Sequence, residues 1–232
     1  MNIDTLIARS KDPAFQKDVR ELTALGVKDP QISAFLLPLL GDAPAIMNTY
    51  SGKRVNLLNP EPETLLDIDV AHHLAGEPRY ASSLTSSYSV GAHCLWVADR
   101  VQDLQRHLKA TPSPGEVLTG LWHDAPEAYL KDLHLPLKRL LRPLYDVLEA
   151  RMWQAMCVTR PLLPSCKTPL VDRADKEAAA KEALALLATP PSWALSFKFE
   201  APECFPLHYA TTYSVEGRWL ARSNELRARI GW

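Results

Sequence analysis

The chain has 232 residues, 47% of them hydrophobic and 23% charged, a composition that excludes disorder over the whole chain and favours one domain with an appendage. Lys and Arg total 26 against 27 Asp and Glu, so the net charge of −1 leaves no global basic surface for a dedicated nucleic-acid binder. The apolar runs are short and interrupted by proline, so we expect a soluble protein without a membrane span.

The beginning of the chain predicts short helices followed by a turn. Nineteen prolines against nine glycines favour helices separated by loops, and Pro13 to Leu25 and Ile32 to Leu40 have helical spacing. We expect residues 1–45 to form an N-terminal helical extension. A Ser-Gly turn within Asn48 to Leu57 predicts a small β-hairpin. Asp67 is then expected to cap a helix that ends near Gly76.

The strongest helical pattern follows and carries a histidine. It begins near Ser87 or Ser89, and His93 lies beside its apolar stripe. A second helix has a specific start signal, because Ser113 and Glu116 form a capping box with proline at the first helical position. That helix is expected to continue from Val117 to Leu130.

Three more helical patterns complete the chain. Leu137 to Met156 and Pro169 to Leu187 belong to the expected central domain, residues 46–190. Val215 to Ile230 forms a helical tail within a C-terminal extension, residues 191–232, that we expect to pack on the same domain. The sequence therefore predicts an all-α fold, a helical bundle with two extensions and one possible hairpin.

A candidate metal centre is visible in four residues of these helices. A hydrolytic metal site needs imidazoles and carboxylates that converge on one cation and leave a position open. The chain offers His93, His123, Asp124 and Asp175 for this purpose. Glu127 follows His123 by four residues, so on a continuous helix both side chains would share a face, one as a ligand and the other handling a proton.

The remaining histidines are better explained as structural residues than as metal ligands. A lone histidine on an amphipathic helix is more often a hydrogen-bonded boundary residue than a ligand, and His73 stays open between the two. No Gly-x-Ser-x-Gly elbow, P-loop or dinucleotide-binding turn occurs. The four cysteines lie far apart without a C-x-x-C pair or a leading signal segment, which favours reduced intracellular thiols.

Three stretches of the chain resemble a known enzyme family. Tyr88 to His93, followed by the uninterrupted stretch Leu121 to Lys138, resembles the HD-domain phosphohydrolases. The detail is most similar to their small deoxynucleotidase branch and to the phage dATP triphosphohydrolases. Val171 to Asp175, with Glu182 seven residues after Asp175, resembles that branch's last metal-aspartate helix. The resemblance covers Tyr50 to Leu187.

The resemblance assigns roles to the metal ligands and the acids. The matching metal ligands are His93, His123, Asp124 and Asp175. Asp175 is preferred to Asp172 because only Asp175 has the family's spacing to Glu182. Glu127 matches the acid beside the scissile phosphate, and Asp132 matches a second acid that assists the leaving group.

The resemblance also implies substrate contacts. Arg79 matches a phosphate-binding arginine, Tyr80 an aromatic contact to the sugar, and Lys138 a further cation for phosphate. The chain departs from the family where a glycine-rich stretch precedes the first metal histidine, since it has Ala81 to Ser87 there.

The expected activity is metal-dependent hydrolysis of a deoxynucleotide. One divalent ion (Zn, Mn, Co or Mg) would polarise a phosphoryl oxygen and lower the pKa of its bound water. A triphosphate substrate, giving nucleoside and triphosphate, is favoured over a 5′-monophosphate, and a non-catalytic metal-stabilised binding protein is the alternative from another class. We expect a homo-oligomer in the cytoplasm of a bacterial or phage-infected cell, with no nucleic-acid polymer or membrane as a partner.

Overall fold

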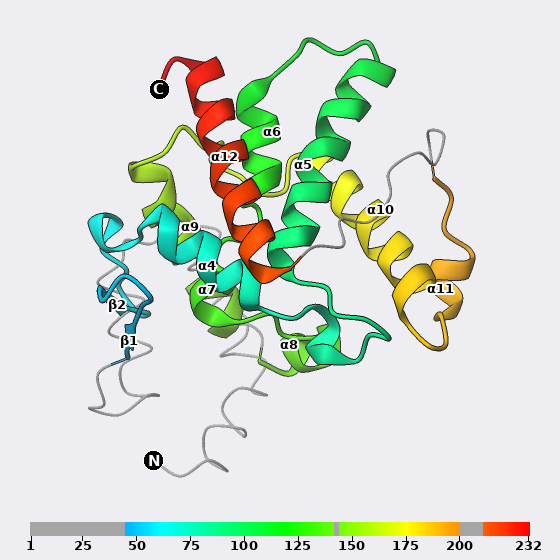
Figure 1. The fold of residues 1–232 in the computed structure, drawn as a ribbon, viewed down its shortest axis with the longest axis horizontal. Helices are drawn as coiled ribbons and strands as arrows, with labels where there is room; N and C mark the ends of the chain where they lie inside the picture. The colour runs from blue at the N-terminus through cyan, green and yellow to red at the C-terminus, as the bar shows by residue number, and fades with distance from the viewer. Residues whose placement is uncertain (1–44, 142–143, 200–210) are drawn as a thin grey trace, which may run out of the picture.

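The computed structural model describes residues 45–141, 144–199 and 211–232, and these residues are mostly helical with one two-stranded hairpin (Figure 1). The all-α prediction is therefore confirmed. The predicted N-terminal helices lie outside the described residues. Across the described ranges, no helix combines the length and apolar character that a membrane crossing would need.

The elements follow one another in a simple order. The hairpin pairs β1 (Ile46–Asn48) with β2 (Arg54–Asn56) in antiparallel register. The helical elements are η1 (Pro62–Thr64), α4 (Asp67–Gly76), η2 (Arg79–Ser82), α5 (Val90–His107), α6 (Pro114–Trp122), α7 (Glu127–Leu130), α8 (Leu135–Leu141), α9 (Leu144–Val158), α10 (Pro169–Leu186), α11 (Ser192–Leu195) and α12 (Thr212–Ile230).

The predicted hairpin is confirmed and is tied to α4 by one buried carboxylate. Its turn uses Gly52 at a φ of +83°, a left-handed conformation that glycine adopts without steric cost. Asp69 of α4 is fully buried and accepts hydrogen bonds from the Ser51 amide at 2.6 Å and the Thr49 hydroxyl at 2.9 Å. These hydrogen bonds hold the hairpin against α4.

Helix α5 is the central helix of the bundle and packs against α4, α6, α10 and α12. It begins as predicted, because the Ser89 side chain accepts a hydrogen bond from the Ala92 amide. Two glycines allow close approach of the neighbouring helices. A Cβ at Gly91 would lie 2.9 Å from Val215 of α12, and a Cβ at Gly120 of α6 would lie 3.2 Å from Val101.

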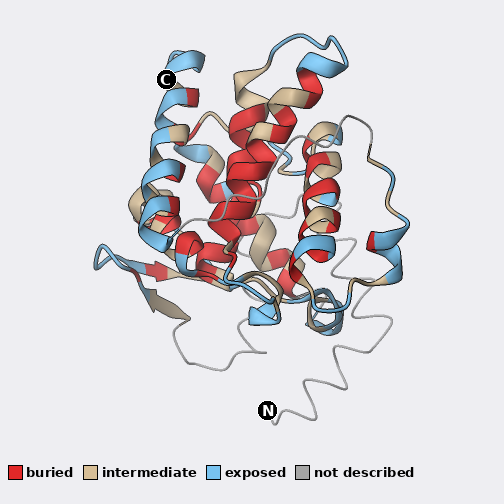
Figure 2. Ribbon diagram, turned by 45° about the vertical axis from the view of Figure 1, so that its right-hand side comes forward, coloured by how far each residue is buried: buried red, intermediate tan, exposed pale blue. Residues whose placement is uncertain are grey.

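The C-terminal helix α12 belongs to the core. It lies along α4, α5 and α6, and Figure 2 shows its buried residues gathered on one side. Trp219 is fully buried with its ring centroid 4.7 Å from that of Trp122, whose indole N–H donates to Ser223 at 3.1 Å. Because apolar burial and the paired indole stabilise this contact, α12 is part of the structure that holds α6 in place.

One predicted helix is interrupted, and the prediction of a continuous helix there was wrong. The helix expected to reach Leu130 stops at Trp122 and resumes as α7 after Pro126, which has no amide hydrogen to donate and disfavours a helical residue before it. The stretch Leu137 to Met156 is helical as α8 and α9 on either side of residues 142–143, which lie outside the described residues.

The cap expected at Asp67 was also wrong. Asp67 lies in the first turn of α4, after the N-cap Leu66, and no side chain caps this helix. The Asp67 carboxylate is instead bound by Arg160 at 2.8 Å and by Arg227 at 2.6 Å. It therefore links α4 to the end of α9 and to α12.

Candidate metal centre

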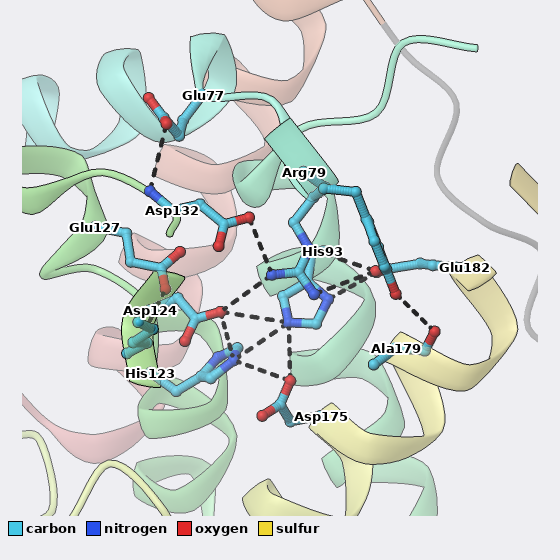
Figure 3. Close-up of polar contacts among 12 residues, drawn as sticks. Glu77, Arg79, His93, His123, Asp124, Glu127, Asp132, Asp175, Ala179 and Glu182 are labelled. Carbon is cyan, nitrogen blue, oxygen red and sulfur yellow. Dashed lines mark hydrogen bonds and ion pairs between the residues drawn. The ribbon is translucent and has the colours of Figure 1, made fainter. Parts of the chain in front are cut away.

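Four side chains from three parts of the fold meet at one point (Figure 3). One ligand atom from each of His93, His123, Asp124 and Asp175 lies within 4.8 Å of every other, so the cluster could hold a metal ion. His93 comes from the first turn of α5, Asp175 from α10, and the adjacent pair His123 and Asp124 from the end of α6. The structure thus brings together all four residues predicted as ligands.

The distances within the cluster show which atoms face one another. The Nε2 atoms of His93 and His123 are 3.3 Å apart. Asp124 Oδ2 lies 3.1 Å from Nε2 of His123 and 3.5 Å from Nε2 of His93. Asp175 Oδ1 lies 3.2 Å and 3.8 Å from Nε2 of His93 and of His123. Two imidazole nitrogens and two carboxylate oxygens therefore share one small volume.

The hydrogen bond made by Nδ1 of each ring determines whether Nε2 has a lone pair to offer a metal ion. His93 Nδ1 lies 2.7 Å from Oε1 of Glu182, and His123 Nδ1 lies 2.8 Å from the carbonyl oxygen of Gly120. Both partners are acceptors, so each Nδ1 donates, and in the neutral ring each Nε2 carries a lone pair. A ring that donates through Nδ1 and keeps Nε2 free is the usual arrangement of a metal-ligating histidine. Four acceptors at such distances need a cation or protons between them.

The pKa values within the cluster reflect the same charge pattern. Burial opposes ionisation of His123, but the neighbouring Asp124 outweighs it and raises the pKa of His123 well above its ordinary value. Burial likewise disfavours the charged form of Asp124, and the interaction with His123 overcomes it and lowers the pKa of Asp124. Burial also opposes the charged form of Asp175, but the hydrogen bonds to His123 and His93 lower its pKa, so both carboxylates remain ionised and attract positive charge to this point.

The interruption after α6 makes the His123 and Asp124 pair possible. Neighbouring residues on a regular helix point about 100° apart, so both would not reach one ion. Here the chain leaves α6 at His123 and forms a turn. The Ala125 amide donates to the carbonyl oxygen of Trp122 at 2.8 Å, and the Glu127 amide donates to the carbonyl oxygen of Asp124 at 2.9 Å. This turn directs both adjacent side chains to the same cluster.

Glu127 lies beside this cluster as a buried acid with one unsatisfied oxygen. Its Oε2 atom is buried without a hydrogen bond, and its Oε1 atom is 3.9 Å from the ammonium of Lys138. Burial, Asp124 and Asp132 together raise the pKa of Glu127 well above its ordinary value. An unsatisfied buried carboxyl is costly to folding, so its presence here favours a role in proton transfer.

Arg79 is held among three acids next to the cluster. Its guanidinium lies 3.3 Å from Glu182, 3.5 Å from Asp132 and 4.0 Å from Asp124. The segment that carries Arg79 is pinned to the start of α5, because the Arg79 amide donates to the Tyr88 carbonyl at 3.0 Å. Arg79 is therefore fixed at the edge of the candidate centre.

The residues after Arg79 adopt a backbone conformation that favours glycine, although the chain has no glycine there. Tyr80, Ala81 and Ser82 have φ values of 53°, 48° and 64°, a left-handed conformation that favours glycine. The Tyr80 hydroxyl donates to the carbonyl oxygen of Ala179 at 2.9 Å, which anchors this turn on α10. Tyr80 thus sits beside Arg79 with its hydroxyl already bonded within the protein.

Asp132 and Lys138 contact residues that lie beside the cluster. The Asp132 amide donates to Glu77 at 3.3 Å, which orients its carboxylate toward Arg79. The Lys138 ammonium donates to Glu149 of α9 at 2.6 Å. Glu149, a half-buried glutamate that no motif indicated, is thus a residue that sequence reasoning missed.

The structure also places three residues whose roles the sequence left open, did not indicate or rejected. His73 accepts from the Tyr50 amide at 3.3 Å through Nε2 and donates to the Ala128 carbonyl at 2.9 Å through Nδ1, so both ring nitrogens are used structurally. Lys167 binds Oδ2 of Asp175, and no sequence signal marked it. Asp172, the rejected neighbour of Asp175, pairs with Lys176 at 2.5 Å on the exposed side of α10.

No protein-family model matches the chain. An uncharacterized protein of Rhodobacter capsulatus is 35% identical over 132 residues, which is 55% of this chain and 64% of that protein. The uncharacterized protein YfdR of Escherichia coli K12 is 30% identical over 127 residues, 54% of this chain and 64% of YfdR. The chain thus spans less than two thirds of each relative's length. Neither name states an activity, so the chemistry of the site rests on its own geometry.

Proposed function

We propose that this protein is an HD-domain hydrolase that cleaves phosphoesters of deoxynucleotides with the help of one divalent ion, releasing nucleoside and triphosphate from a dNTP. One observation carries the proposal. Four acceptor atoms converge within 4.8 Å of one another, directly beside the buried carboxyl of Glu127, whose Oε2 has no partner. A cluster that only held helices together would gain nothing from a buried carboxyl with an unsatisfied oxygen.

The metal and the nearby acid have complementary tasks. When bound, the divalent ion supplies Lewis-acid polarisation of a phosphoryl oxygen and lowers the pKa of water. The raised pKa of Glu127 makes its carboxylate a stronger proton acceptor than that of an ordinary glutamate. Glu127 therefore orients the attacking water and accepts its proton.

The cations around the cluster suit a phosphate group. Arg79 presents a guanidinium held by Glu182 and Asp132, and its preset orientation limits the entropy lost when it binds phosphate. Lys138, with its ammonium between Glu127 and Glu149, supplies a second positive charge. Asp132 lies next to Arg79 and faces the sugar hydroxyl or the leaving oxygen.

The experiment is a hydrolysis panel. Purified protein is incubated with dNTPs and dNMPs, with chelator or with added Mn²⁺, Co²⁺, Zn²⁺ or Mg²⁺, and released triphosphate and phosphate are measured. We expect metal-dependent triphosphate release that Asp124→Ala abolishes, because removing one of four ligands leaves an incomplete coordination shell. Phosphate release from dNMPs alone would assign the monophosphatase reaction instead, and stoichiometric metal without turnover on any nucleotide would overturn the hydrolase.

A further inference from the structure

Lys167 is a third cation at this centre, and it comes from the connection before α10. The next residue, Thr168, caps α10 through the Val171 amide at 3.3 Å. The Thr168 hydroxyl also donates to Glu116 at 2.6 Å, which fixes this connection to the start of α6. The lysine therefore extends from an anchored backbone.

The two oxygens of Asp175 have different partners. Oδ1 faces the two histidines at 3.2 Å and 3.8 Å, and Oδ2 is bound by the Lys167 ammonium. Asp175 can therefore offer one oxygen to a metal ion while the other keeps the lysine at the edge of the cluster. The Lys167 ammonium is thus a positive charge at the edge of the cluster.

The three cations differ in partners and in access. Arg79 pairs with Glu182, Asp132 and Asp124, whereas Lys138 pairs with Glu149 and Glu127. Their side chains are 12% and 20% exposed. The Lys167 side chain is 42% exposed, so it is the cation of the three most open to a large anion.

We propose that Lys167 is a substrate-binding residue that contacts the phosphates beyond the scissile one and so favours a 5′-triphosphate over a 5′-monophosphate. The proposal rests on the proposed function and names the substrate class of the same site. Four acids, Asp124, Glu127, Asp132 and Asp175, surround the reacting position. A polyphosphate chain carries several negative charges and needs more positive charge than a monophosphate does.

The test compares Lys167→Met and Lys167→Arg with a matched control, Lys176→Met. Lys176 also pairs with an aspartate of α10 (Asp172), but on the exposed side of the helix, where its side chain is 63% exposed. Metal-loaded proteins are assayed for kcat/KM on a dNTP and on the dNMP of the same base, and for binding of inorganic triphosphate by calorimetry.

We expect Lys167→Met to lower kcat/KM for the dNTP and the affinity for triphosphate by about 10-fold or more, the range for one lost charged hydrogen bond. The dNMP reaction should change by less than about 3-fold, Lys167→Arg should retain most triphosphate affinity, and Lys176→Met should match wild type.

Other outcomes overturn the inference. An equal loss on both nucleotides, or loss of bound metal measured by mass analysis, would make Lys167 a support for Asp175 instead of a phosphate contact. The calorimetric experiment separates this inference from the hydrolase proposal, because triphosphate binding is measured without turnover. If the wild-type protein hydrolyses no nucleotide but loses triphosphate affinity on Lys167→Met, the hydrolase fails and the anion contact stands.

Discussion

The Nδ1 atom of His93 lies 2.7 Å from Oε1 of Glu182, a fully buried glutamate 89 residues further along the chain. The carboxylate orients the imidazole so that Nε2 faces the cluster. It also binds Arg79 at 3.3 Å, so the same residue aligns a candidate metal ligand and the arginine that we propose to bind phosphate. Glu182 is therefore the link between the two halves of the proposed site.

We expect Glu182→Gln to weaken metal affinity by about 10-fold to 100-fold, the usual effect of losing the partner of a metal-ligating histidine. A neutral amide no longer supports the basicity of the His93 ring. The measurement is a metal titration followed by calorimetry. Glu225→Gln, at an exposed residue of α12, is the control and should leave the affinity unchanged. Equal affinity in all three proteins would exclude Glu182 from the site.

Asp175→Asn and Asp172→Asn should differ sharply. Asp175 Oδ1 lies 3.2 Å from Nε2 of His93, whereas Asp172 pairs with Lys176 on the surface. We expect Asp175→Asn to lose most bound metal and at least about 10-fold in hydrolysis, and Asp172→Asn to change both by less than about 2-fold. Metal content per chain and release of triphosphate are measured together. Loss in the Asp172 variant alone would reverse the assignment of the fourth ligand.

Glu127→Gln should separate catalysis from binding. The carboxyl contacts no ligand atom of the cluster as a bonded partner, so the variant keeps its metal and still binds nucleotide. We expect kcat to fall by about 10²–10⁴-fold, the contribution of a positioned acid or base. Steady-state rates at saturating nucleotide in metal-loaded protein give kcat, and calorimetry gives nucleotide affinity. Wild-type turnover would indicate that another acid handles the proton, and Asp132 would then be examined first.

The same residue should make stability depend on pH. Because burial, Asp124 and Asp132 raise the folded-state pKa of Glu127 above its ordinary value of 4.5, the folded protein holds a proton that the unfolded chain has already released. Its contribution to stability is present below pH 4.5 and is lost as pH rises toward the raised pKa. In chelator, Glu127→Gln should therefore unfold like wild type near pH 4 and be the more stable protein at pH 7. Urea titrations at both values measure this, and a constant difference would contradict it.

The C-terminal helix should be essential for folding. Trp219 is fully buried against Trp122, so Trp219→Ala removes a large apolar contact and leaves a cavity. We expect a loss of about 3–5 kcal/mol in the free energy of unfolding, measured in urea. Trp232→Ala is the control, because that side chain is 65% exposed and its removal should cost under about 0.5 kcal/mol. Similar losses in both variants would mean that α12 contributes to stability in a different way.

The sequence by itself determined the features that depend on neighbouring residues. Helical class and the starts at Ser89 and Ser113 were predicted correctly, because each cap is satisfied by an amide three residues away. The four candidate ligands could also be named, because the stretch Leu121 to Lys138 resembles the HD-domain phosphohydrolases and the spacing to Glu182 favours Asp175 over Asp172. Only the tertiary structure decided how these ligands are oriented and which charges surround them. The spacing to Asp175 marked Glu182 but not its contact with His93, and no local spacing marked Lys167 or Glu149 as neighbours of the centre.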